Sequence, residues 1–150
     1  LFGSGKVSGK LYGGCLESLG ELLLGGRYGD EPVVNETYQL LCRDTRDKLL
    51  FLETSEEKPT PERVKLLLAA LEKVDFFRHA KGLIVGKPQD EAYYDDYRSI
   101  YQALAEKYQL PLLYNVNFGH AHPKCILPIG QSVTLDLDDK TVKLLSPLAR

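Results

Sequence analysis

Methionine and tryptophan are absent from this sequence, and cysteine occurs only three times, at Cys15, Cys42 and Cys125. Widely spaced cysteines in an odd number, none in a Cys-x-x-Cys pair, argue against a disulfide framework and favour free thiols in a reducing compartment. The chain begins at Leu1 and shows no apolar stretch typical of a secretory signal. We therefore expect a cytoplasmic protein, of which this chain is one piece.

An excess of one charge and long apolar runs are also missing. The chain has 19 Lys and Arg residues against 21 Asp and Glu residues, and its pI is near 5.9. A protein that binds nucleic acid typically has an excess of basic residues on its surface, so no nucleic-acid partner is expected. No apolar run approaches the ~20 residues of a membrane-spanning helix, so no membrane partner is expected either. The 150 residues, 43% of them apolar, suit one globular domain.

Alternating strand and helix patterns are present instead. Short apolar runs predict three buried strands, at residues 48–53, 82–85 and 111–116. Apolar residues at helical spacing predict three helices, at residues 16–24, 61–74 and 94–108. The second of these helices begins with Thr60 as its N-cap and Pro61 in its first turn.

The remaining segments predict less regular structure. Residues 1–14 contain five glycines and are expected to form an irregular entry. Residues 27–47 are polar and predict a loop, with a short strand around residues 38–42. Residues 132–137 and 141–145 alternate about a polar turn and predict a closing hairpin.

The order of these elements predicts an α/β fold. Strands separated by helices favour right-handed crossovers and a parallel core, to which the hairpin adds antiparallel strands. We therefore expect a mixed sheet with crossover helices and a C-terminal hairpin.

Reactive side chains follow the predicted strands. Glu53 closes the first strand, Lys87 follows the second, and His120 lies just past the third, after Gly119. Ligands of open α/β sheets collect at the carboxyl ends of the strands. A carboxylate and an imidazole that meet there form the base half of a hydrolytic triad. The alternative is that Glu53 is a solvated strand end and His120 an ordinary loop residue.

No nucleophile accompanies this pair. None of the seven serines lies in a Gly-x-Ser-x-Gly elbow. Cys15 follows two glycines, but a small buried residue at a helix start is the simpler interpretation. A base without a nucleophile fits a fragment of a larger enzyme.

Two other features carry rival interpretations. His120, His122 and Cys125 could suggest a metal site, but Pro123 argues for a loop and no further ligand cluster lies nearby. Four tyrosines at and before the start of the third helix could form an aromatic platform for a base, although core packing is favoured: Tyr93, Tyr94, Tyr97 and Tyr101.

The motifs resemble, in order along nearly the whole chain, the C-terminal domain of the LD-carboxypeptidase family of serine peptidases. Residues 10–19, KLYGGCLESL, resemble its opening segment G-x-L-x-G-G-C/N-L, and residues 50–53, LFLE, resemble the strand that ends in the triad glutamate. Residues 86–88, GKP, match its G-K/R-P loop. Residues 118–123, FGHAHP, followed by LPIG resemble F-G-H-T-D-P…L-P-I-G, whose first histidine is the triad base.

The wording of these motifs is closest to the microcin C immunity branch of the family. His122 stands where that branch often has Asp, and Arg27 stands where Thr is common. Both differences affect the expected substrate and leave the expected triad residues unchanged.

The resemblance implies that Glu53 orients His120, which acts as general base and then general acid. It implies that the nucleophilic serine lies on an N-terminal domain absent from residues 1–150, the whole of which would be the C-terminal domain. Lys87, Gly14 and Cys15 are candidate substrate-binding residues, with a plain loop lysine as the alternative for Lys87. No metal and no cofactor are implied.

The implied reaction is hydrolysis of an amide, in a peptidoglycan peptide or between an aminoacyl group and a nucleotide. A fold of the swivelling β/β/α type and a homodimer are also implied. By itself the chain is expected to be inactive. The alternative is a non-catalytic binding or interaction domain derived from the same family.

Overall fold

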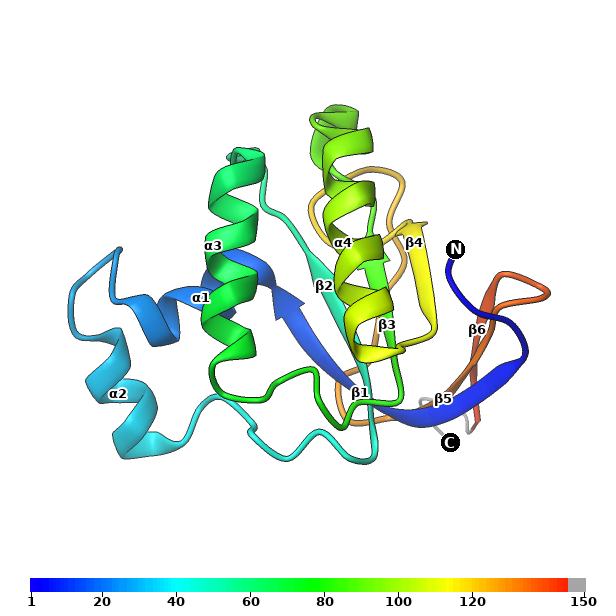
Figure 1. Cartoon of the computed structure of the whole chain (residues 1–150), viewed down its shortest axis with the longest axis horizontal. Helices are drawn as coiled ribbons and strands as arrows, with labels where there is room; N and C mark the ends of the chain where they lie inside the picture. The colour runs from blue at the N-terminus through cyan, green and yellow to red at the C-terminus, as the bar shows by residue number, and fades with distance from the viewer. Residues whose placement is uncertain (146–150) are drawn as a thin grey trace.

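The computed structural model describes residues 1–145 and contains one curled, mixed sheet (Figure 1). Its order is β4-β3-β2-β1-β5-β6. The strands are β1 (Lys6–Cys15), β2 (Lys48–Glu53), β3 (Gly82–Gly86), β4 (Leu112–Val116), β5 (Ser132–Asp136) and β6 (Thr141–Leu144). Strands β1 to β4 are parallel, and β5 is antiparallel to both β1 and β6. The predicted mixed sheet and closing hairpin are confirmed.

Three of the helices cover one face of this sheet. The helices are α1 (Leu16–Leu24), α2 (Glu31–Tyr38), α3 (Pro61–Glu72) and α4 (Tyr94–Tyr108), with a short 3₁₀ turn, η1 (Gln89–Glu91). Figure 1 shows α3 and α4 side by side in front of the sheet, whereas α2 lies at the end of the molecule and packs against α1. None of the helices within residues 1–145 is long and apolar enough to cross a bilayer.

Strand β2 is buried on both faces, which explains its continuous apolar run. Leu50 and Leu52 pack against the helices, while Leu49 and Phe51 belong to the core on the other face. The predicted start of α3 is also confirmed, because the Thr60 hydroxyl accepts a hydrogen bond from the backbone N–H of Arg63 at 3.3 Å. These elements place the carboxyl ends of β1 to β4 along one rim.

Two sequence predictions were wrong. The glycine-rich entry is not irregular, because residues 6–15 form β1, a central strand of the sheet. The prediction for residues 27–47, a loop with a short strand around residues 38–42, is also wrong: residues 31–38 form helix α2, Gln39 adopts a left-handed conformation with φ of 50°, and residues 38–42 form no strand. The buried side-chain carbonyl of Asn35 accepts a hydrogen bond from the N–H of Leu41, which folds the chain back on the helix.

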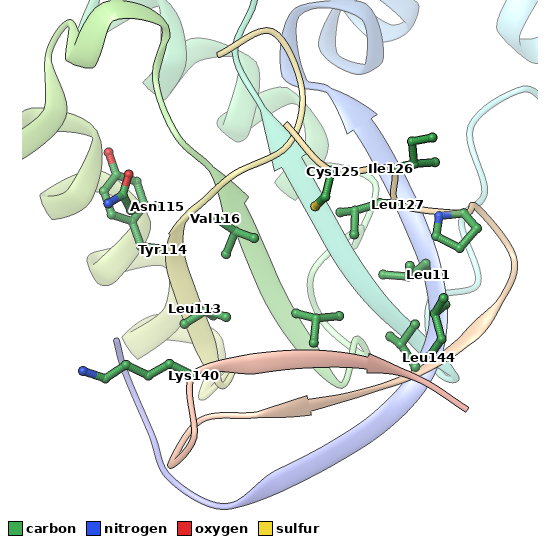
Figure 2. Close-up of a pocket in the computed structure, with 13 residues that line it drawn as sticks. Leu11, Leu113, Tyr114, Asn115, Val116, Cys125, Ile126, Leu127, Lys140 and Leu144 are labelled. Carbon is green, nitrogen blue, oxygen red and sulfur yellow. The ribbon is translucent and has the colours of Figure 1, made fainter. Parts of the chain in front are cut away.

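The face of the sheet opposite the helices is covered by the segment 117–131 and by the curl of β5 and β6. An apolar hollow of about 470 Å³ remains between them and is lined by Leu11, Leu113, Val116 and Leu127 among others. In Figure 2, Leu127 points toward the sheet, whereas Ile126 points away from it. The hollow lies under the segment that follows His120, and neither Glu53 nor His120 lines it.

Candidate active site

Glu53 and His120 meet at the rim where the parallel strands end. Nδ1 of His120 lies 2.8 Å from Oε2 of Glu53, and the backbone N–H of His120 donates to the same oxygen at 3.2 Å. The exposed fraction of the side chain is 8% for Glu53 and 39% for His120. The carboxylate is therefore buried beneath the imidazole, and the imidazole faces solvent.

The loop that carries His120 is anchored to the strand that carries Glu53. Phe118 is buried and places its ring edge against Phe51 of β2, with the ring centroids 5.7 Å apart. The N–H of Cys125 donates to the carbonyl of Asn117 at 2.7 Å and closes the loop. Gly119 adopts φ of +82°, a left-handed conformation that glycine adopts readily, and the chain turns there just before His120.

The charge around His120 favours its protonated form. The hydrogen bond to Glu53 raises the pKa of His120 above its ordinary value of 6.5, burial of the ring opposes this rise, and the negative charges of Glu53, Glu56 and Glu17 add to it. The second ring nitrogen, Nε2, lies 3.1 Å from Oε2 of Glu56. The imidazole is thus held between two carboxylates.

Glu56 and Glu17 were not predicted from the sequence. Glu56 lies in the segment 54–58, which predicts only a polar loop, and Glu17 lies in the first turn of α1. The one available signal was the position of Glu56 three residues beyond a candidate triad acid. Its approach to His120 depends on the path of the loop, which no local pattern specifies.

Gly14 and Cys15 lie at the same rim. Cys15 is the residue of β1 that is opposite Glu53 in the parallel register, and it is the N-cap of α1. Burial raises the pKa of its thiol to about 11, so the thiol stays protonated at neutral pH. Cys15 thus stands at a helix start as predicted but is half-buried rather than buried, and substrate binding by either residue stays a prediction.

Lys87 directly follows β3, so strand β2 lies between it and Cys15 at the end of β1. Its ammonium group pairs with Glu91 at 2.8 Å, and its side chain is 24% exposed. It lines a hollow of about 400 Å³ together with Ala121 and His122. Lys87 is therefore near the candidate site, and substrate binding by it also stays a prediction.

The structure also bears on the metal site, the aromatic platform and the missing nucleophile. Within residues 1–145, no group of three or more His, Cys, Asp and Glu side chains is arranged to hold a metal ion. Tyr97 and Tyr101 are almost completely buried against the sheet, as the packing interpretation predicts. No serine among the described residues hydrogen-bonds to His120, and Ser55, the nearest in sequence to Glu53, donates to Glu17.

A buried carboxylate that holds an imidazole at the carboxyl rim of a parallel sheet has the arrangement of the acid and the base in a hydrolytic triad. The fold and the site together define a mixed α/β domain that carries a carboxylate–imidazole pair at the carboxyl rim of its sheet. The profile of the LD-carboxypeptidase C-terminal domain matches residues 8–135, and the chain belongs to this family.

Individual relatives agree with this assignment. The microcin C7 self-immunity protein MccF of Escherichia coli is 30% identical over 147 residues, which are 95% of this chain and 38% of that protein. The crystal structure of an MccF-like protein from Streptococcus pneumoniae, in complex with AMP, superposes with a TM-score of 0.88 at 39% identity over 95% of this chain and 42% of that one.

A second solved structure is also similar to this chain. MccF in complex with glutamyl sulfamoyl guanosine gives a TM-score of 0.71 at 25% identity over 99% of this chain and 41% of that chain. The chain therefore spans about two fifths of the length of these relatives. The predicted family and fold are confirmed.

Proposed function

We propose that this chain is the acid–base half of a serine hydrolase that cleaves an amide bond, with the nucleophilic serine on an N-terminal half that residues 1–150 do not include. The observation that carries the proposal is the 2.8 Å contact between Nδ1 of His120 and Oε2 of Glu53. The buried acid holds the ring at Nδ1, which leaves the other nitrogen, Nε2, as the one that can exchange a proton with a substrate or nucleophile. A nucleophile docked on the rim would take the place beside that nitrogen that Glu56 occupies in this structure.

The proposed reaction assigns one task to each group. His120 accepts the proton of the serine hydroxyl at Nε2 while the serine oxygen attacks the amide carbonyl, and Glu53 stabilises the imidazolium that forms. His120 then gives that proton to the leaving nitrogen, and the C–N bond breaks. In the second half, His120 takes a proton from water, which attacks the acyl ester and releases the serine with its proton restored.

The substrate that we favour is an aminoacyl group joined through an amide to a sulfamoyl- or phosphoramidate-linked nucleotide. MccF has been solved with glutamyl sulfamoyl guanosine and with aspartyl sulfamoyl adenosine, and the Streptococcus pneumoniae protein has been solved with AMP. The second candidate is the bond between an L-centre and a D-amino acid in a peptidoglycan peptide, which the family name supports.

The experiment mixes this chain with the serine-bearing half of the same protein and offers both substrates separately. We expect hydrolysis of an aminoacyl-sulfamoyl adenosine by the mixture and none by either half alone, because each half lacks part of the triad. Cleavage of an L,D-tetrapeptide only would select the second substrate. Binding of the substrate without any hydrolysis would overturn the proposal in favour of a non-catalytic binding domain.

A further inference from the structure

The two ring nitrogens of His120 both face carboxylate oxygens. Nδ1 contacts Glu53 at 2.8 Å, and Nε2 contacts Glu56 at 3.1 Å. A neutral imidazole carries only one N–H, whereas the imidazolium carries two. Both contacts are therefore hydrogen bonds only when His120 is charged, and a charged His120 cannot accept a proton from a nucleophile.

The loop that presents Glu56 is held in place from several sides. The N–H and hydroxyl of Ser55 donate to Oε1 of Glu17 at 2.9 and 2.6 Å. Lys58 pairs with Asp90 of η1 at 2.6 Å, and the hydroxyl of Tyr97 donates to the carbonyl of Pro59. These contacts fix the backbone on both sides of Glu56.

The side chain of Glu56, unlike its backbone, is free to turn away. It is 68% exposed, so moving it into solvent uncovers little surface and breaks only its contact with His120. Glu53, which is 8% exposed, has no such freedom. Of the two carboxylates that contact His120, Glu53 is therefore fixed in place, whereas Glu56 can move away.

We propose that Glu56 is a reversible competitor of the nucleophile: it occupies Nε2 of His120 at rest and leaves before that nitrogen accepts a proton. The identity of the nucleophile rests on the proposed function, whereas the contact between Glu56 and His120 does not. Glu56 thereby adds a third residue to the pair at the rim and controls when His120 acts as a base.

Deprotonation of the ring and release of Glu56 are coupled. When His120 loses a proton, Nδ1–H stays with Glu53, and Nε2 presents a lone pair to the Glu56 carboxylate, which repels it. The groups that act on the ring are Glu53 from β2, Glu56 from the loop after β2, and Glu17 from α1, and all three are acidic. Their negative charges stabilise the protonated ring at low pH, and with it the contact between Glu56 and Nε2. As the pH rises and the ring loses its proton, that contact is lost.

The test is a titration of the His120 ring by NMR in the 150-residue chain, with Glu56→Gln and Glu56→Ala as variants. Both substitutions remove the second carboxylate, so the pKa of His120 should fall. Glu57→Gln is the matched control, because Glu57 is 67% exposed like its neighbour but pairs with Arg27 at 3.3 Å. An unchanged pKa in both Glu56 variants, or an equal fall in the control, would overturn the proposal.

A second measurement follows kcat/KM against pH after the serine-bearing half is added. Below the pKa of His120, Glu56→Gln should raise kcat/KM by roughly two- to fivefold, the range of an exposed ion pair, and the gain should vanish above that pKa. A gain that is equal at all pH values contradicts the coupling. If no variant and no wild-type mixture hydrolyses anything, the proposed function fails, while the NMR titration still decides the role of Glu56.

Discussion

Gly119 lies so close to the carboxylate of Glu53 that a side chain at position 119 would displace that carboxylate. A Cβ atom built on Gly119 would lie 2.4 Å from Oε2 of Glu53, and the residue already has φ of +82°. The turn before His120 and the carboxylate that holds its ring therefore share one small space. The position of the acid and the position of the base depend on the same residue.

Gly119→Ala should separate the acid from the base. The new methyl group pushes the Glu53 carboxylate away from Nδ1, so the pKa of His120 should fall toward its ordinary value, and the strained backbone should lower the free energy of unfolding by about 1 kcal/mol. NMR titration and urea unfolding measure the two effects.

Gly130→Ala is the control for that experiment. Gly130 has φ of +83°, and nothing lies within 4 Å of the position of its Cβ. It should therefore show a similar loss of stability without any change in the pKa of His120. If the two variants have the same effect on His120, the contact between Gly119 and Glu53 does not position the carboxylate.

The stability of the domain should depend on pH through His120. Because the pKa of His120 is raised in the folded state, its stabilisation is complete below the unfolded value of 6.5 and is lost as the pH rises through the folded value. Urea unfolding of the wild type should show this loss, and Glu53→Gln should flatten it. An identical pH dependence in the two proteins would contradict the assignment.

Two buried tyrosines on α4 should respond oppositely to loss of the hydroxyl. The hydroxyl of Tyr101 is buried and has no hydrogen-bond partner among the described residues, so Tyr101→Phe should leave the free energy of unfolding unchanged or raise it by up to about 1 kcal/mol. Tyr97 donates to the Pro59 carbonyl, so Tyr97→Phe should lower it by about 1 kcal/mol. Thermal unfolding compares them, and a larger loss in Tyr101→Phe would show that its hydroxyl has a partner.

Much of the fold could be predicted because local patterns and tertiary packing agree. The apolar run of β2 is buried on both faces, and Thr60 caps α3 as its position in the sequence indicates. Strand β1 could not be predicted, because its glycines are typical of a loop. The reason for one of them lies in another strand: a Cβ on Gly13 would lie 1.8 Å from the carbonyl oxygen of Phe51.

The candidate site was likewise predictable only in part. Glu53 and His120 could be proposed because Glu53 ends one strand with a strong apolar pattern, His120 follows another, and parallel strands end at one rim. Helix α2 and the contact of Glu56 with His120 could not be predicted. Val33 and Tyr38 of α2 are exposed and give no apolar stripe, and Glu56 is positioned by contacts that α1, η1 and α4 make with its loop.

The most direct test compares the wild type with His120→Ala, each joined to the serine-bearing half, in the hydrolysis of an aminoacyl-sulfamoyl adenosine. Because His120 is the only base in the proposed reaction, kcat/KM should fall by at least about a thousandfold in a variant that remains folded. A folded His120→Ala protein that keeps activity within a few-fold of the wild type would contradict the account.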